Sequence, residues 1–370
     1  MSQTKEKRHR LRTAVLLPFF AGGIVGAIFA GIISADKRSL TDILFMIVGM
    51  LAAFFIQIIV HEGGHLIFGL LSGYSFSSFR IMSFMWIKED GRLRMKRLSL
   101  AGTGGQCLMA PPELKDGKMP VFWYHLGGVI MNFLTAGLFL ALYFIPGRVP
   151  FFSDFCLAMA FVGILYAVMN GIPIHTTLID NDGYNAYALS KDKKAMRAMW
   201  VQLKVNELNS VGVRLKDMPD ELFEVPKIED MNNSMVAAVG VFAANRLMDE
   251  HRFDEAEALM KQILNADTAV AGIYRNMMTC DRVYIELTGE NRKEKVEELY
   301  TQELVQFMKQ MNRFPTIVRT QYVYELLGRK DPEKAAEYKK LFEQISGTYP
   351  YRTDIQSERE LMELAEKKVL

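Results

Sequence analysis

The chain has 370 residues, a formal net charge of +2 and 50% hydrophobic residues. This length allows two or three domains, and the near-neutral charge argues against a nucleic-acid partner. The composition changes near residue 190, because long apolar runs precede it and charged residues are frequent after it. We therefore place the main domain boundary there.

Four apolar runs in the first half are long enough to cross a membrane. They cover residues 13–35, 43–71, 121–145 and 151–172. An apolar stretch of about 18 residues or more is a candidate transmembrane helix. Four such runs in one half of a chain are not expected of a soluble protein, so the sequence predicts four transmembrane helices.

The first run follows the basic segment KEKRHRLR, which is also typical of a cleaved signal peptide. Its apolar part is longer than a signal core, and no small-residue cleavage site follows it. We therefore predict a retained helix within residues 1–40. Lysine and arginine are concentrated at the N-terminus and between the second and third runs, which predicts that both termini are cytoplasmic.

The second run contains His61, Glu62 and His65, its only ionisable side chains between residues 43 and 71. Ionisable groups inside a membrane helix are costly and usually functional. Residues four apart share one face of a helix, so His61 and His65 can bind one metal ion, and imidazole suits zinc. Glu62 can then act as a general base on a water molecule, as in the HExxH pattern.

A catalytic zinc ion usually has a third protein ligand. Soluble enzymes of the HExxHxxGxxH type are excluded, because Phe68 and Leu71 occupy the positions concerned. The segment NGIPIHTTLIDNDGYNAY, residues 170–187, offers three candidates, which are His175, Asp180 and Asp182. The residues alone leave all three open, as well as a DNDG turn that binds no metal.

Three motifs in chain order resemble the site-2 proteases, which are intramembrane zinc metalloproteases of peptidase family M50. They are HEGGH (residues 61–65), GGVIMN (127–132), and NGIP followed by DG (170–173 and 182–183). The resemblance implies a three-helix catalytic core, one catalytic Zn²⁺, and Asp182 as the third ligand in preference to Asp180. The usual Leu before this Asp-Gly pair is replaced by Asn181.

Between the second and third runs, apolar and polar residues alternate on both sides of Asp90 and Gly91. This pair predicts a two-residue turn, and we expect a small cytoplasmic β-hairpin within residues 74–118. The hairpin can add an extended substrate strand at its edge or meet anionic lipid with a basic face, and the sequence favours neither. Gly102, Gly104 and Gly105 predict a tight or re-entrant turn that lines the cleft.

Residues 191–370 have a helical pattern throughout. Segments 243–264 and 324–345 are similar to tetratricopeptide units, although their spacing does not fit the repeat period, and a plain helical bundle is the alternative. We expect a cytoplasmic all-α domain that binds a protein partner, positions substrates or regulates access to the site.

Together these features predict a polytopic α-helical membrane protein with an N-terminal helix (residues 1–40), a metalloprotease core (41–190) and a helical domain (191–370). The predicted function is a zinc endopeptidase that cleaves single-pass membrane proteins or membrane-associated peptides. His61, His65 and Asp182 would bind zinc, and Glu62 would be the general base. Asn132 or Asn170 would stabilise the oxyanion or hold the substrate backbone.

Two other functions are compatible with parts of the sequence. A catalytically silent scaffold would bind membrane proteins, but it has no need of Glu62. A zinc carrier would need polar ligands along its other spans, and the first run has none. The small number of predicted domains and the resemblance predict that the protein lies in a bacterial cell membrane.

Overall fold

The computed structural model describes residues 39–89, 91–98, 104–147, 149–174 and 180–369. The predicted first transmembrane helix lies outside these residues, as do Asp90, Gly102 and His175. The described chain forms two compact units. Unit 1 comprises residues 39–65 and 125–187, and unit 2 comprises residues 66–124 and 188–369.

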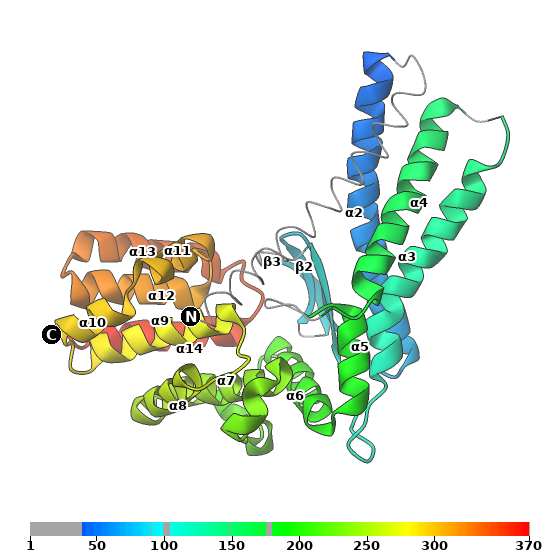
Figure 1. Ribbon diagram of the computed structural model, residues 1–370. Helices are drawn as coiled ribbons and strands as arrows, with labels where there is room; N and C mark the ends of the chain where they lie inside the picture. The colour runs from blue at the N-terminus through cyan, green and yellow to red at the C-terminus, as the bar shows by residue number, and fades with distance from the viewer. Residues whose placement is uncertain (1–38, 90, 99–103, 148, 175–179, 370) are drawn as a thin grey trace, which may run out of the picture. The chain divides into compact units, whose positions relative to one another are not determined.

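Three helices are long and apolar enough to span a membrane: Leu44–Leu71, Val121–Tyr143 and Pro150–Gly171 (Figure 1). They correspond to α2 (Leu40–Leu71), α3 (Val121–Tyr143) and α4 (Pro150–Gly171). The second, third and fourth predicted runs are therefore confirmed as long helices. Two of them begin at a start signal in the sequence: the Ser39 hydroxyl accepts a hydrogen bond from the backbone N–H of Asp42 in α2, and Pro150 is the first residue of α4.

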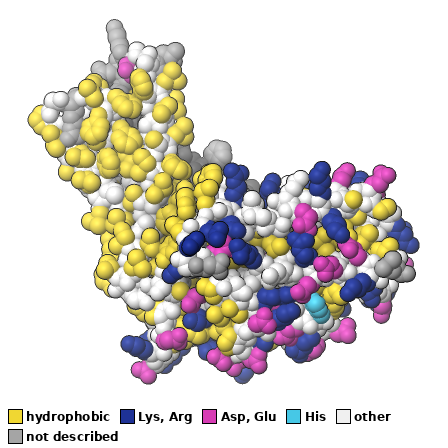
Figure 2. Space-filling model, turned by 180° about the vertical axis from the view of Figure 1, so that it is seen from behind, with side chains coloured by type: hydrophobic (Ala, Val, Ile, Leu, Met, Phe, Trp, Pro, Cys, Tyr) yellow, Lys and Arg dark blue, Asp and Glu magenta, His cyan; other side chains and the backbone are white. Residues whose placement is uncertain are grey.

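The surface of these helices is apolar, and only a small core lies between them. In unit 1, Ala53, Ala158, Met159 and Val162 are buried together. Large side chains such as Leu51 and Leu134 are at least 60% exposed, and hydrophobic side chains cover the long helices in Figure 2. Such a surface suits a lipid environment, where apolar side chains need no burial against protein.

The loop after α2 forms a four-stranded antiparallel sheet in the order β3-β2-β1-β4. Its strands are β1 (Ser75–Ile81), β2 (Phe84–Glu89), β3 (Arg92–Arg97) and β4 (Gly105–Ala110). The predicted hairpin is confirmed as β2 and β3, because Glu89 pairs with Arg92. It is part of a larger sheet, since β4 pairs with β1, which precedes the hairpin in the chain.

The predicted turn at Gly102, Gly104 and Gly105 lies partly outside the described residues, and the described segment Gly105–Ala110 is strand β4. Pairing with β1 supplies the backbone hydrogen bonds of this segment. Cys107, Met109 and Ala110 are buried in this strand. The strand therefore buries apolar side chains that a re-entrant turn would leave exposed. A glycine-rich composition does not reveal this long-range pairing.

The remaining residues form an all-helical region, as predicted (Figure 1). Its elements are α5 (Asp182–Lys191), α6 (Lys193–Ser210), η1 (Leu215–Asp217), η2 (Asp220–Leu222), η3 (Ile228–Asn232), α7 (Ser234–Asp249), α8 (Phe253–Asn265), α9 (Gly272–Thr288), α10 (Lys293–Leu299), α11 (Gln302–Gln310), α12 (Pro315–Val323), η4 (Tyr324–Gly328), α13 (Pro332–Ser346) and α14 (Arg352–Glu366). Side-chain caps start several of them. Asp192 caps α6, Asn233 caps α7 and Asp331 caps α13.

A buried charge network joins three of these helices. Arg319 on α12 is fully buried and donates hydrogen bonds to Glu358 on α14, at 2.7 Å, and to Asp281 on α9. Its guanidinium lies over the ring of Tyr284, 4.8 Å from the centroid. A buried arginine with two carboxylate partners fixes how these helices pack, because loss of Arg319 would leave both buried carboxylates without a counter-charge.

The sheet and the helical region belong to the same compact unit. Trp200 Nε1 on α6 donates to the carbonyl of Pro112 at 3.0 Å. Arg352 at the start of α14 pairs with Glu89 on β2 at 2.6 Å. The backbone N–H of Arg97 donates to the carbonyl of Thr348 at 3.0 Å.

Candidate metal centre

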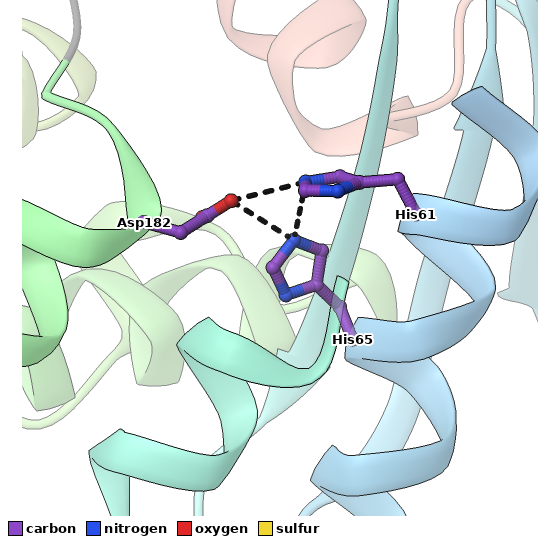
Figure 3. A group of neighbouring side chains, drawn as sticks. All are labelled: His61, His65 and Asp182. Atoms are coloured by element: carbon purple, nitrogen blue, oxygen red, sulfur yellow. Dashed lines mark hydrogen bonds and ion pairs between the residues drawn. The ribbon is translucent and has the colours of Figure 1, made fainter. Parts of the chain in front are cut away.

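Helix α2 places two histidine side chains on one face. His61 and His65 are one turn apart, and both are less than 10% exposed. Their Nε2 atoms are 3.1 Å apart, and their ring planes lie at 85° to each other. Figure 3 shows both rings pointing to the same place beside the helix. The i, i+4 spacing of the HExxH pattern therefore brings two nitrogen ligands together.

The carboxylate of Asp182 faces the two histidines from the first residue of α5 (Figure 3). Its Oδ2 atom is 3.0 Å from His61 Nε2 and 3.4 Å from His65 Nε2. The three ligand atoms all lie within 4.8 Å of one another. Asp180, the other described candidate, is not part of this group.

Asn181 holds the connection between α4 and α5 in place. Its Oδ1 atom accepts from the backbone N–H of Tyr184 at 3.0 Å, as a helix N-cap does. Its Nδ2 group donates to the carbonyls of Ile172 at 2.6 Å and Met169 at 2.8 Å, at the end of α4. These three hydrogen bonds hold Asn181, the residue directly before Asp182, against the end of α4 and the start of α5.

Gly183 allows α5 to begin close to α4. A Cβ atom at Gly183 would lie 2.3 Å from the carbonyl oxygen of Gly171, a distance that no side chain tolerates. The Asp-Gly pair therefore combines a ligand with the close backbone approach that carries it to the histidines.

The distances among the three ligand atoms suit a tetrahedral metal ion. Zinc binds histidine nitrogen and carboxylate oxygen at about 2.0–2.2 Å, which separates tetrahedral ligand atoms by about 3.3 Å. The observed separations are 3.0, 3.1 and 3.4 Å. Two imidazoles with one carboxylate are also a ligand set that zinc uses, so the residues fit a bound Zn²⁺.

The electrostatics of the site keep Asp182 ionised. Burial opposes its charge, but the charge of His65 and hydrogen bonds from His125, His61 and His65 lower the pKa of this carboxyl well below its ordinary value. An ionised carboxylate is the form that binds a metal ion.

The second nitrogen of His61 is held by a buried amide network. Its Nδ1 atom lies 2.7 Å from Oδ1 of Asn132 on α3. The Asn132 amide in turn donates to Oε1 of Gln57 at 2.7 Å, and Gln57 donates to the carbonyl of Met159 at 3.0 Å. An acceptor opposite Nδ1 keeps a proton on that nitrogen, so Nε2 of His61 is the atom that can give up its proton and bind a metal ion.

Asn132 was expected at the oxyanion or the substrate backbone. Asn132 is fully buried, and its Oδ1 atom lies beside Nδ1 of His61. Asn170, the other asparagine proposed for that role, donates to the carbonyl of Tyr166 in its own helix, at 3.0 Å. The contact of Asn132 suits the orientation of a metal-binding histidine.

His125 on α3 is a site residue that the sequence reasoning missed. It is 5% exposed, and its Nδ1 atom lies 3.9 Å from Oδ1 of Asp182, the carboxylate oxygen other than the one nearest His61. A signal was present, because His125 lies in the third apolar run and the rule that selected His61 applies to it equally.

Glycines bring α2 and α3 together at the site. A Cβ atom at Gly64 would lie 2.3 Å from the carbonyl oxygen of Gly127. One at Gly128 would lie 2.6 Å from the ring of His61. The second glycine of HEGGH and those of GGVIMN are therefore required by the packing of the two helices around the ligand.

The site combines metal-binding geometry with a buried acid beside it. Glu62 follows His61 on α2 and is 9% exposed. The three long apolar helices and the buried His-His-Asp group are consistent with the resemblance to site-2 proteases. In comparisons with protein-family models, curated proteins and solved structures, no match to this chain was found.

Proposed function

We propose that this protein is an intramembrane zinc endopeptidase of the site-2 protease type. The observation that carries the proposal is the convergence of His61, His65 and Asp182 within 4.8 Å, on or beside helices that are apolar enough to span a membrane. Ionisable groups in such helices are energetically costly, and they usually mark a functional site. The substrate is a transmembrane segment of a single-pass protein or a membrane-associated peptide.

Glu62 is the general base and acid of this reaction. His61, His65 and Asp182 would hold a zinc ion, which when bound would supply Lewis-acid activation of water and of the scissile carbonyl. Glu62 takes the proton of the attacking water and delivers it to the leaving amine. Burial of Glu62 among apolar helices excludes bulk water from this proton transfer.

Two further residues position the ligands. Asn132 fixes the proton of His61 on Nδ1, and His125 faces the second oxygen of Asp182. Such partners orient metal ligands and raise their basicity, so they contribute to metal affinity without binding the ion.

The helical region would support the proteolysis by binding a protein partner in the cytoplasm. Its segment 243–264 covers the end of α7 and most of α8, two helices joined by a short turn at His251, which has a φ of +59°. This arrangement supports a tetratricopeptide-like unit, a type of repeat that binds proteins. We place both termini in the cytoplasm of a bacterial cell, on the distribution of lysine and arginine.

The decisive experiment compares cells that express the wild-type chain with cells that express Glu62→Gln. Membrane proteomics would search for fragments that end inside transmembrane segments. We expect these fragments to fall at least about a hundredfold in the variant, since general acid–base catalysis contributes that much or more. The purified variant should still bind zinc, because Glu62 is not a ligand.

Glu229→Gln is the matched control, because this glutamate is 77% exposed and lies on η3. It should leave the fragments unchanged. Identical fragment profiles in wild type and Glu62→Gln, with zinc bound in both, would refute the protease and favour a silent scaffold. Zinc transport that survives in Glu62→Gln would favour a carrier.

A further inference from the structure

The sheet in unit 2 is tethered closely to two of the long apolar helices. Helix α2 ends at Leu71 and β1 begins at Ser75, so only residues 72–74 lie between them. A chain of this length reaches about 10 Å. At the other end, β4 ends at Ala110 and α3 begins at Val121.

The ends of the two helices pack directly on the sheet. Tyr124 of α3 stacks on Tyr74 with ring centroids 4.8 Å apart, and it donates a hydrogen bond to the carbonyl of Cys107 on β4 at 2.8 Å. Large apolar side chains at these helix ends are exposed: Ile67, Leu70, Leu71, Phe122 and Trp123. Unit 2 therefore exposes apolar side chains next to its sheet.

One face of the β2–β3 hairpin is apolar and exposed. The strand register places Phe84 beside Arg97, Trp86 beside Met95 and Lys88 beside Leu93, and these six residues define the hairpin face. Phe84 is 41%, Met95 60% and Leu93 62% exposed. The opposite face packs inward, because Met85 and Ile87 are buried. The hairpin therefore packs on unit 2 through the face of Met85 and Ile87, and its hairpin face stays exposed.

The hairpin carries an excess of positive charge. Lys88, Arg92, Arg94 and Arg97 are exposed. The acidic residue described in the hairpin, Glu89, is buried and paired with Arg94 at 3.1 Å and Arg352 at 2.6 Å. The charge of Lys88 and Arg97, which belong to the hairpin face, is thus available to an anionic surface.

We propose that the hairpin face docks on the surface of an anionic lipid bilayer. Leu93, Met95 and Phe84 would enter the boundary between headgroups and acyl chains, with Trp86 at headgroup level. Lys88 and Arg97 would lie against lipid phosphates. This inference rests on the proposed insertion of α2 and α3 into a membrane.

The structure favours lipid over an added peptide strand at this place. Strand addition uses the backbone groups of the sheet edge, and the Arg97 N–H on edge strand β3 is already bonded to Thr348. It also leaves the exposed apolar side chains of the hairpin face without a role. Contact with a bilayer uses these side chains and the flanking cations together.

Quenching by brominated lipid tests the proposal on the full chain in nanodiscs. The discs contain phosphatidylcholine alone or an equimolar mixture with phosphatidylglycerol, brominated near the headgroup end of the acyl chains. A bimane label is attached at Leu93→Cys, at Leu51→Cys on α2, or at Lys293→Cys on α10. The native cysteines Cys107, Cys156 and Cys280 are buried, and the unmodified chain measures their background labelling.

We expect the Leu51 label to be quenched in both discs and the Lys293 label in neither. The Leu93 label should be quenched in the anionic discs and much less in the neutral ones. Each basic side chain near an anionic surface changes the docked-to-undocked ratio about fivefold. Lys88→Glu with Arg97→Glu should therefore lower that ratio at least about 25-fold, whereas Lys293→Glu with Lys309→Glu should leave it unchanged.

The Leu51 label separates failure of this proposal from failure of the membrane location. Quenching at Leu51 without quenching at Leu93 in anionic discs would overturn lipid docking while the helices remain in the bilayer. Equal quenching at Leu93 in both discs, insensitive to the charge reversal, would overturn the role of anionic lipid. No quenching at Leu51 would overturn membrane insertion itself. If the Leu93 label is not quenched, hydrogen exchange of the β3 amides is measured with and without an added peptide. Protection of these amides by the peptide would show that the sheet edge binds an added strand.

Discussion

His61 is the residue on which the site is organised, because each of its ring nitrogens faces a different partner. Its Nε2 atom lies 3.0 Å from Asp182, and its Nδ1 atom lies 2.7 Å from Asn132. The buried amides of Asn132 and Gln57 settle which nitrogen carries the proton. A histidine with this support presents its lone pair to a metal ion without first having to change tautomer.

Asn132→Leu tests that support. We expect zinc affinity to fall by about 10- to 100-fold, the usual effect of losing the partner of a metal-binding histidine. Equilibrium zinc binding to the purified chain, with thermal unfolding as a check on folding, measures it. Asn170→Leu should leave the affinity unchanged, because Asn170 bonds within its own helix. Unchanged zinc affinity with slower cleavage would instead return Asn132 to a role at the oxyanion.

At the scale of elements, the contact between α2 and α3 depends on which glycine faces the neighbouring helix. Gly63 and Gly64 both occupy the variable positions of HEGGH. A Cβ atom at Gly64 would meet the Gly127 carbonyl at 2.3 Å, whereas one at Gly63 has no atom within 4 Å outside its own helix. Gly64 is therefore required for the close approach of the two helices, whereas Gly63 is not.

Alanine at these two positions should have opposite effects. Gly64→Ala should destabilise the chain by about 1–3 kcal/mol or more through overpacking and reduce its bound zinc. Gly63→Ala should preserve or raise stability, since alanine favours a helix by about 1 kcal/mol relative to glycine. Thermal unfolding and zinc content of the two variants give the comparison. Equal losses in both would show that the helices approach each other differently.

At the scale of the whole molecule, the second compact unit contains a half-buried acid whose charge opposes folding. Asp354 on α14 bonds Asn209 on α6 at 3.1 Å and lies near Tyr349. Burial, together with the like charges of Glu358 and Asp249, raises its pKa from 3.8 to about 7, although the Asn209 hydrogen bond works in the other direction. The folded chain therefore holds this proton at a pH where the unfolded chain has lost it.

The sign of the resulting pH dependence follows from this difference. Between about pH 4 and pH 7 the folded state binds more protons at Asp354, so its contribution to stability is lost as the pH rises through that window. Asp354→Asn removes the titration and keeps the oxygen that accepts from Asn209. The variant should match the wild type near pH 5 and melt at a higher temperature near pH 8. A melting difference independent of pH would contradict the raised pKa.

The sequence by itself determined the features that depend on neighbouring residues. Hydropathy marked α2, α3 and α4, because a helix that meets lipid must be apolar along its whole length. The i, i+4 spacing placed His61 and His65 on one face, and the Asp-Gly pair marked the turn between β2 and β3. Helical periodicity also identified the C-terminal half as all-α.

Only the tertiary structure decided the features that join distant segments. Asp182 lies 121 positions from His61, and from the residues alone Asp180 remained an equal candidate; the turn built by Asn181 and Gly183 decides which carboxylate reaches the histidines. The pairing of β4 with β1 and the Asn132 and His125 contacts have no local pattern. Their stability comes from burial and hydrogen bonds that exist only after the helices and strands have packed.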